Sequence, residues 1–486
     1  MRAAALGLCA LLTACVTAPP PRVASDHAAV EAALLRDITE LASDAYQGRR
    51  PGTEGEAKTL GYLAREWQAA GLVSGTNDPA NAWYAPVEFA LSIPVESEAQ
   101  FWRGKEKLEL ARGAVAFFTS GRRALVDRAP LVYVGRLGEE LADSELVGRV
   151  AVMEWDHGAH LEQRELLLAS GAAAVLAVVG DQREMAELVE RRRTGVYRIA
   201  SDEGGDLLDG FVTREAARFL FGPARLAALE DEAAQPGFRP RTLGISVTVD
   251  TVSTPGTVRT HNLIGRLPGR DPGAGAVLVL AHWDHFGICA GEPADTICNG
   301  AVDNASGLAA LTELARRLGA GPQLDRDVYF LATTGEEWGL LGAQAFAQDP
   351  PVPLDSIVAA FNLDTMAVAP RGGPVAIVGA GLTPLDAPIE AAIRAQGRAI
   401  GDPAYAERNL KRQDGWALLQ HDVPAVMVSS TFADPAALRR YTATRYHKPG
   451  DEVAGIELGG AADDVLLHLA LVRQFASRQA WPGKRR

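Results

Sequence analysis

Apolar residues recur at helical spacing over the first part of the chain. From Val30 to Leu72 they follow one another at steps of three and four positions, as Leu34, Ile38 and Leu41 do. This periodicity predicts amphipathic helices that bury one face. Gly71 stands where a glycine would end the second of them.

The middle of the chain has a different pattern of short apolar runs between glycine-containing and charged turns. Three runs predict strands, over residues 131–134, 150–154 and 173–179. The highly charged segment 181–193 predicts a solvated helix. His157 and His160 are the potential metal ligands that cluster in this part, and a surface or turn position is the commoner explanation for both.

After Arg259 apolar runs of strand length alternate with amphipathic helices. The runs cover residues 276–281, 328–332, 357–361, 375–378 and 425–428, and a helix is predicted over 308–318. Continuous apolar strands between helices indicate an α/β fold, a doubly wound and mostly parallel sheet with helices on both faces. In such sheets ligands bind beyond the carboxyl ends of the strands.

Composition narrows the function classes. The chain has 486 residues, of which 47% are hydrophobic and 22% charged, as expected of a soluble globular protein with two domains or one large insertion. The formal net charge of −13 argues against nucleic acid as a partner, because binding to phosphates requires a positive surface.

The N-terminus has the pattern of an export signal. Met1-Arg2 precedes an apolar run over residues 3–14, too short for the ~20 residues of a membrane span. The tetrapeptide ending in Cys15 looks like a bacterial lipobox, and an ordinary signal peptide is the alternative. We expect a signal at 1–14, a tether at 15–29, and export to the bacterial cell envelope (outer membrane or periplasm), with membrane contact through a lipid anchor at Cys15.

Two further cysteines, Cys289 and Cys298, lie outside the signal. In an exported protein a disulfide between them is the default expectation. Their spacing does not match the short Cys-to-Cys hairpins of structural zinc sites.

Potential ligands follow the predicted strands. His282 ends the first strand, and Asp284 would project to the same side if the strand continued. Asp303 precedes the helix from Leu308, where it or Asn304 could equally be an ordinary helix cap.

The adjacent Glu336 and Glu337 follow the second strand. Two buried like charges are costly without a cation or a shared proton, so one of them can ligate metal while the other acts as general base. Asp364 follows the third strand, and His447 lies in a Pro-Gly loop. Asp364 could equally be an ordinary turn aspartate, and His447 an ordinary loop histidine.

The candidate residues lie in five motifs, which follow one another in the order AHWDHFG, NGAVDNASG, TTGEEWGLLGA, FNLDTM and YHKPGDE. Together these motifs closely resemble the co-catalytic zinc aminopeptidase family, to which secreted bacterial leucyl aminopeptidases and glutamate carboxypeptidase belong. The early YQGRRPGTEGE and the later HNLIGRLPG also resemble parts of that family. The resemblance implies a catalytic domain at 30–85 and 256–480, and a smaller β-rich (α+β) insert at 86–255 similar to a protease-associated domain.

The resemblance also implies roles for the matching residues. Two Zn²⁺ ions would be held by five ligands: His282, Asp303, Glu337, Asp364 and His447. Asp303 would bridge both ions. Glu336 would be the general base, Asp284 the partner of His282, and Tyr446 a donor to the oxyanion. Where many relatives carry Ser-Asp-His, this chain has Gln413-Asp414-Gly415, so substrate preference does not transfer.

These residues predict an exported zinc exopeptidase acting on peptides, with an aminopeptidase favoured. A carboxypeptidase of the same family remains the alternative and needs an arginine for the terminal carboxylate, for which Arg371, Arg408 and Arg412 are candidates. A glutaminyl cyclase, which works with one zinc, and an inactive receptor are disfavoured because every ligand and the base are retained.

Overall fold

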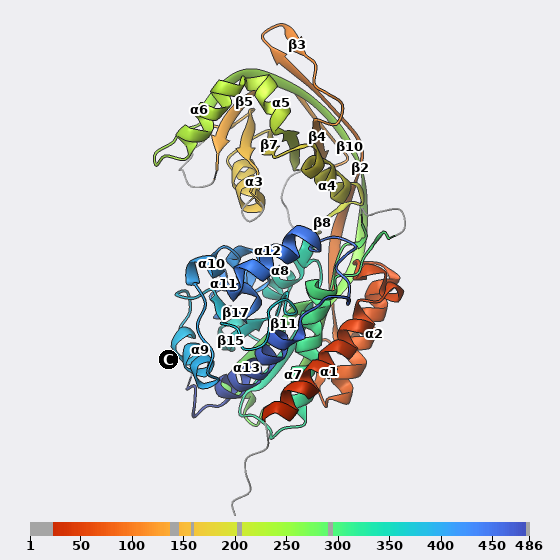
Figure 1. The fold of residues 1–486 in the computed structure, drawn as a ribbon. Helices are drawn as coiled ribbons and strands as arrows, with labels where there is room; N and C mark the ends of the chain where they lie inside the picture. Colours follow the sequence, from red (N-terminus) through yellow and green to blue (C-terminus); the bar gives the residue numbers. More distant parts are fainter. Residues whose placement is uncertain (1–22, 137–144, 157–159, 202–206, 290–294, 483–486) are drawn as a thin grey trace, which may run out of the picture.

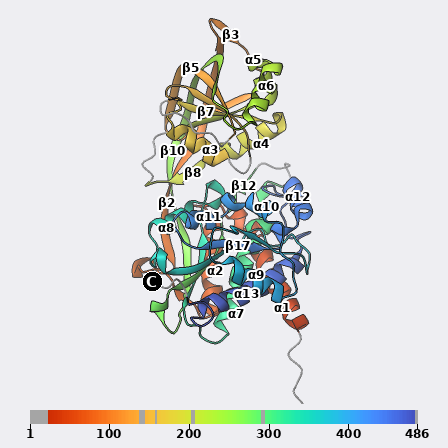
Figure 2. The same cartoon turned by 90° about the vertical axis from the view of Figure 1, so that its left-hand side faces the viewer.

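The computed structural model describes residues 23–136, 145–156, 160–201, 207–289 and 295–482. They form two parts, one above the other in Figure 1, joined by two long paired strands. Seen from the side (Figure 2), the same two strands run between the parts. These strands are β2 (Tyr84–Arg103) and β10 (Arg241–Leu267), paired antiparallel from Tyr84 opposite Leu263 to Trp102 opposite Ser246.

The lower part is built on a mostly parallel sheet. Its strand order is β16 (Ala376–Val378), β17 (Ala425–Ser429), β15 (Ile357–Asn362), β11 (Ala276–His282), β14 (Asp327–Thr333) and the end of β10, with the short β1 (Val73–Ser74) also on β10. β11 runs parallel to both β14 and β15, and β15 runs parallel to β17. β16 and β10 are the antiparallel members. The predicted α/β fold is confirmed.

Helices cover both faces of this sheet, as the alternation along β11 requires. Val277 and Val279 share one core with four helices: α1 (Val23–Leu41), α2 (Glu54–Ala69), α7 (Ser306–Gly319) and α13 (Leu458–Ala476). Leu278 and Leu280 point to the other face and pack with α8 (Leu341–Gln348) and α11 (Gly415–Leu419). Three further helices belong to this part: α9 (Asp386–Ala395), α10 (Pro403–Glu407) and α12 (Pro435–Thr444).

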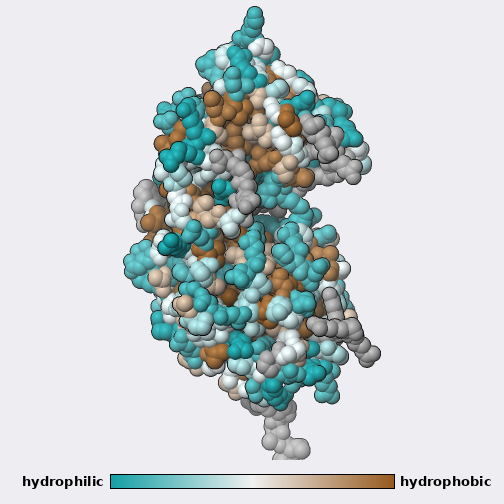
Figure 3. Space-filling model, turned by 180° about the vertical axis from the view of Figure 1, so that it is seen from behind, coloured by the Kyte–Doolittle hydropathy of each residue, from teal (hydrophilic) through white to brown (hydrophobic). Residues whose placement is uncertain are grey.

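The upper part continues the sheet with its own strands and helices. The strands are β3 (Glu106–Leu108), β4 (Val115–Thr119), β5 (Arg123–Gly135), β6 (Val150–Glu154), β7 (Ala174–Val179), β8 (Val196–Ile199) and β9 (Leu208–Thr213). The helices are α3 (His160–Ala169), α4 (Gln182–Arg193), α5 (Arg214–Phe221) and α6 (Pro223–Ala233). Two separate apolar cores lie on the two faces of the upper strands, and apolar residues also gather on the upper part of the surface in Figure 3.

The tether expected over 15–29 does not extend that far, because α1 begins at Val23. The segment after Pro21 has no further proline and contains good helix formers such as Ala28 and Ala29. His27 is buried there beside Asp463, which ties the start of the helix to α13. The signal, Cys15 and His157 lie outside the described residues.

Two smaller expectations are also resolved. Cys289 and Cys298 form the predicted disulfide, with their Cα atoms 5.7 Å apart, next to the two-residue strands β12 (Gly287–Ile288) and β13 (Ile297–Cys298). His160 starts α3 and packs on Trp155, their ring centroids 4.0 Å apart, in the upper part of the molecule.

In the described part of the chain, every helix is too short or too polar to cross a membrane.

Candidate active site

The candidate ligands gather at the carboxyl ends of three neighbouring strands. His282 is the last residue of β11, Glu337 follows β14 and Asp364 follows β15. The sheet order β15-β11-β14 makes these strand ends adjacent, and all three side chains are at most slightly exposed. These side chains thus lie at the edge of the sheet where ligands bind in α/β folds.

Asp303 joins the cluster from the turn before α7, and it does not cap the helix. Asn304 supplies the capping contact, since its Oδ1 accepts the backbone N–H of Gly307 at 2.9 Å. The carboxylate of Asp303 is left free to face two histidines. Its Oδ1 lies 3.2 Å from Nε2 of His282, and its Oδ2 lies 3.2 Å from Nε2 of His447. Each oxygen of Asp303 thus faces a different histidine, which is the arrangement expected of a carboxylate that bridges two metal ions.

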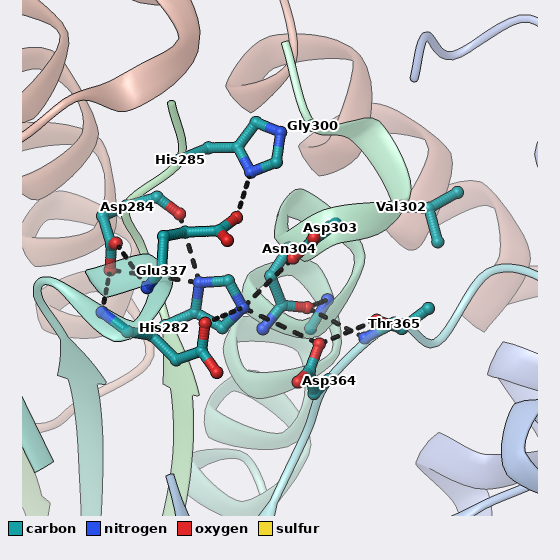
Figure 4. A network of polar contacts seen from close by, with 12 residues as sticks. His282, Asp284, His285, Gly300, Val302, Asp303, Asn304, Glu337, Asp364 and Thr365 are labelled. Atoms are coloured by element: carbon teal, nitrogen blue, oxygen red, sulfur yellow. Dashed lines mark hydrogen bonds and ion pairs between the residues drawn. The ribbon is translucent and has the colours of Figure 1, made fainter. Parts of the chain in front are cut away.

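His447 reaches the site from the loop after α12. Its Nε2 lies 3.0 Å from Oε2 of Glu337, and its ring stacks on Tyr446 with centroids 3.6 Å apart. On the other side, Nε2 of His282 lies 3.7 Å from Oδ1 of Asp364. The structure therefore brings all five candidate ligands together in two adjoining groups that share Asp303. Figure 4 shows four of them, His282, Asp303, Glu337 and Asp364.

The donors in this cluster fit divalent metal. Two groups have ligand atoms that all lie within 4.8 Å of one another: His282, Glu336 and Asp364, and His285, Asp303 and Glu337. Among the described residues, the buried Nε2 atoms of His282 and His447 lack a hydrogen-bond partner although carboxylate oxygens are close. Buried imidazole nitrogens that lack a hydrogen-bond partner and face carboxylate oxygens provide the mixed nitrogen and oxygen ligands that suit a cation such as Zn²⁺.

Electrostatics supports the same conclusion. Burial raises the pKa of Glu336 well above its usual value, and the neighbouring Glu337 adds to the effect. Burial, followed by repulsion from Asp303, raises the pKa of Glu337 to about 7. Burial lowers the pKa of His282, but the carboxylates of Glu336, Asp303 and Asp364 outweigh burial and raise it well above 6.5. A cation would relieve this crowding of buried carboxylates.

Asp284 has a different environment from the one its spacing indicated. β11 ends at His282, so Asp284 does not continue a strand, and its carboxylate Oδ1 stays 3.9 Å from Nδ1 of His282. The backbone carbonyl of Asp284 is closer, at 3.1 Å from that Nδ1. The carboxylate instead accepts the backbone N–H groups of Glu336 and Glu337, at 3.1 and 3.3 Å. The carboxylate of Asp284 therefore holds the turn at Glu336 and Glu337, and it also lies beside His282.

Three residues at the site had no role assigned from the sequence, although two of them stood in the quoted motifs. His285 is buried, and its Nδ1 lies 2.5 Å from Oε1 of Glu337. Asp451 accepts the backbone N–H of Asp303 at 3.0 Å and so fixes the bridging turn. Asp414 is buried and accepts a hydrogen bond from the hydroxyl of Thr333. The sequence did point to these residues: His285 and Asp451 stand in the motifs, and Asp414 stands in the Gln413-Asp414-Gly415 segment.

Glu336 and Tyr446 border the ligands. Oε2 of Glu336 lies 3.9 Å from Nε2 of His282, farther than the oxygens of Asp303 and Asp364. The hydroxyl of Tyr446 accepts a hydrogen bond from Nη2 of Arg412 at 3.2 Å. The carboxylates of Glu336 and Asp364 contribute to raising the pKa of Arg412, after the larger effect of Tyr446. This arginine therefore faces the site, whereas Arg371 lies beside Gly459 at the start of α13.

The upper part of the molecule also contacts the site. Nη1 of Arg191, near the end of α4, lies 3.3 Å from Nδ1 of His447. The ring of Tyr197 in β8 packs against Trp338, beside the Glu-Glu turn, with centroids 4.7 Å apart. Lys411 pairs with Glu162 of α3. Residues of the predicted insert thus line one side of the candidate site.

Comparison with solved structures finds the same fold over nearly the whole chain. An aminopeptidase from Aneurinibacillus sp. strain AM-1 matches with a TM-score of 0.58 at 18% identity, covering 92% of this chain and 95% of that one. A zinc aminopeptidase from Bacillus subtilis matches with a TM-score of 0.51 at 16% identity, covering 93% and 96%. At such identities the likeness establishes the fold. No curated protein sequence matches the chain.

A family model gives the chemical class. Peptidase family M28 matches residues 262–470, a segment that contains every candidate ligand from His282 to His447, together with Glu336 and Tyr446. The matched region thus coincides with the carboxyl-end cluster described above. Residues 262–470 are therefore a peptidase family M28 domain, and the chain is a metallopeptidase.

Proposed function

We propose that this metallopeptidase is a two-zinc exopeptidase and that it removes N-terminal residues from peptides. The single observation that supports it most strongly is the position of Asp303, whose two oxygens each lie 3.2 Å from a different buried histidine. One zinc would be held by His282, Asp303 and Asp364, and the other by Asp303, Glu337 and His447. Mixed imidazole and carboxylate ligands with open positions suit catalytic zinc.

Zinc bound there would supply Lewis-acid chemistry, polarising the peptide carbonyl and lowering the pKa of the attacking water. Glu336 is the group that moves the proton. Its carboxylate borders the ligand cluster without closing on His282 as tightly as Asp303 does. It accepts the proton of the water at Oε2 and passes it to the leaving amine nitrogen. Asp284 keeps Glu336 in place through the backbone N–H of that residue.

Tyr446 is placed to donate to the oxyanion that develops on the scissile carbonyl. Its ring is fixed by stacking on His447, with centroids 3.6 Å apart. The guanidinium of Arg412 donates to the same hydroxyl oxygen. Because that oxygen accepts from Arg412, its own proton is free to point into the site.

Attack at the N-terminus is favoured by charge. A free α-amine is cationic near neutral pH, and the site is rich in carboxylates, among them those of Glu336, Glu337 and Asp364. The two solved structures described above are aminopeptidases by name. Both points support an aminopeptidase.

Arg412 favours a second candidate, a carboxypeptidase, because a guanidinium facing the ligands suits a terminal carboxylate. A panel of peptides with free or blocked ends separates the two, using the purified chain loaded with zinc. Cleavage that requires a free N-terminus supports the aminopeptidase. Release of C-terminal residues from N-blocked peptides selects the carboxypeptidase, and no cleavage of any peptide contradicts both.

We also propose that the chain works outside the cytoplasm and that residues 86–255 limit access to the site. The disulfide between Cys289 and Cys298 supports an oxidising compartment. The contact of Arg191 with His447 supports a covering role for the insert.

Metabolic labelling with a radioactive fatty acid tests whether Cys15 carries a lipid anchor. Label in the wild-type chain and none in Cys15→Ala supports lipidation, and an unlabelled wild-type chain contradicts it.

A further inference from the structure

Arg49 is a fully buried arginine between α1 and α2, outside the segment that matches the peptidase family model. The chain around it approaches the loops of the site very closely. A Cβ atom on the preceding Gly48 would lie 2.3 Å from the carbonyl oxygen of Cys298, so only glycine fits there. This close approach carries the side chain of Arg49 beneath the metal-site loops.

The guanidinium of Arg49 donates to five backbone carbonyl groups. Nε donates to Trp283 at 3.0 Å, Nη1 to Leu41 at 2.9 Å and Asn299 at 2.5 Å, and Nη2 to Gly300 at 3.0 Å and Asp303 at 3.5 Å. A guanidinium has five N–H donors, so its capacity is filled. Among the described residues it has no ion pair with a carboxylate.

Four of these five carbonyls belong to the segments that present metal ligands. Trp283 lies between His282 and Asp284, while Asn299, Gly300 and Asp303 form the bridging turn. The backbone carbonyl of Arg49 also accepts the N–H of His285 at 3.3 Å. One side chain therefore connects the end of β11 to the turn before α7, which the sheet hydrogen bonds do not connect.

The charge of Arg49 suits the same place. Burial lowers its pKa to about 10, while Asp303, Asp451 and Asp284 act in the opposite direction. The side chain thus remains cationic at neutral pH. It offsets repulsion among the carboxylates without neutralising any one of them by direct contact.

We infer that Arg49 is a positioning residue for the two-metal site, setting the distance between His282 and Asp303 through the backbone carbonyls of their loops. This inference rests on the proposed function. Lysine cannot replace arginine in this role, because an ammonium has three donors and no planar fork. Loss of the contacts lets the two ligand loops shift relative to each other and weakens binding of metal.

The test compares Arg49→Lys with Arg326→Lys. Arg326 is also buried and donates to backbone carbonyls, those of Ala274 and Phe475 at 2.8 Å each. It lies just before β14, at the opposite end of that strand from the site. The control therefore removes a buried arginine of similar bonding without touching the ligand loops.

Zinc affinity is measured by competition with a chelator, and site geometry by the visible absorption of the cobalt-substituted protein. We expect Arg49→Lys to lose about tenfold to a hundredfold in affinity, as for other partners of ligand residues, and to show an altered cobalt spectrum. Arg326→Lys should lower the melting temperature and leave the zinc affinity and cobalt spectrum as in the wild type.

Wild-type affinity and spectrum in Arg49→Lys would overturn the inference. So would failure of both Arg49→Lys and Arg49→Gln to fold, because the residue would then serve the fold as a whole. These results differ from a failure of the proposed function, in which the wild-type chain itself binds no zinc and cleaves no peptide.

Discussion

Nδ1 of His285 lies 2.5 Å from Oε1 of Glu337, and both side chains are buried. Burial lowers the pKa of His285 to about 4, so the ring is neutral near pH 7. A neutral ring can donate one proton, and the nearby carboxylate makes Nδ1 the donor. His285 thus orients Glu337 so that its other oxygen, Oε2, faces His447.

The change His285→Ala is expected to weaken zinc binding about tenfold to a hundredfold, because the carboxylate of Glu337 loses the donor that orients it. Chelator competition on the purified variant measures the effect. His421→Ala is the matched control, since that histidine is exposed and lies away from the ligands. Equal zinc affinity in the two variants would show that Glu337 needs no such donor.

Asp451 links the His447 loop to the turn of Asp303. It accepts the backbone N–H groups of Val302 and Asp303 and the hydroxyl of Tyr441, at 3.0 to 3.2 Å. In Asp451→Asn an amide NH₂ replaces one acceptor oxygen, so we expect unfolding free energy to fall by about 2–3 kcal/mol. Urea unfolding in the presence of chelator measures it. A change below ~0.5 kcal/mol would argue that the carboxylate does not hold the turn.

Asp414 predicts a pH dependence of the zinc-free protein. Burial raises its pKa to about 6, above the value of ~3.9 in an unfolded chain. The folded state therefore binds the proton more tightly, and stability falls as pH rises from about 4 to 6. Asp414→Asn carries no charge to bury and is expected to be more stable than the wild type at pH 7, by on the order of 1–3 kcal/mol.

Thermal unfolding in chelator across pH 4–8 checks this prediction. The stability difference between Asp414→Asn and the wild type should shrink toward the acidic end of the range. A difference that is constant with pH would mean that the carboxyl does not titrate in this window.

The disulfide predicts a modest gain in stability. Cys289 and Cys298 are nine residues apart, and closing a loop of that size contributes on the order of 2–3 kcal/mol in the chain-entropy model. Reduction, or the change Cys289→Ser, should lower the melting temperature while the remaining core stays folded. An unchanged melting temperature after complete reduction would show that the loop is held without the bond.

Much of the lower part of the fold was predictable from the sequence because its strands are buried on both faces. The runs at 276–281, 328–332 and 357–361 became β11, β14 and β15 with boundaries shifted by one residue. The positions of the candidate ligands after these strands followed from the general rule for α/β sheets. His447 could not be located in this way, since it lies in an irregular loop and only the motif around it pointed to the site.

Other features depend on contacts that no local pattern contains. The expected domain limits at 86 and 255 lie within β2 and β10, which continue through both parts as one ladder. Asp284 turned toward the backbone of Glu336 because β11 ends one residue before Trp283. Arg49 is 254 positions from Asp303 in the sequence, yet it donates to the carbonyl of that residue. Such long-range hydrogen bonds of backbone carbonyls leave no periodic signal.

Hydrolysis and zinc content of Glu336→Gln, measured on the same sample, test the central claim most directly. The amide keeps the shape of the side chain and removes its ability to accept a proton. Two zinc ions per chain with peptide hydrolysis reduced about 10²- to 10⁴-fold are expected from the loss of a general base alone. Wild-type turnover in Glu336→Gln, or wild-type protein that binds no zinc, would contradict the proposed two-zinc mechanism.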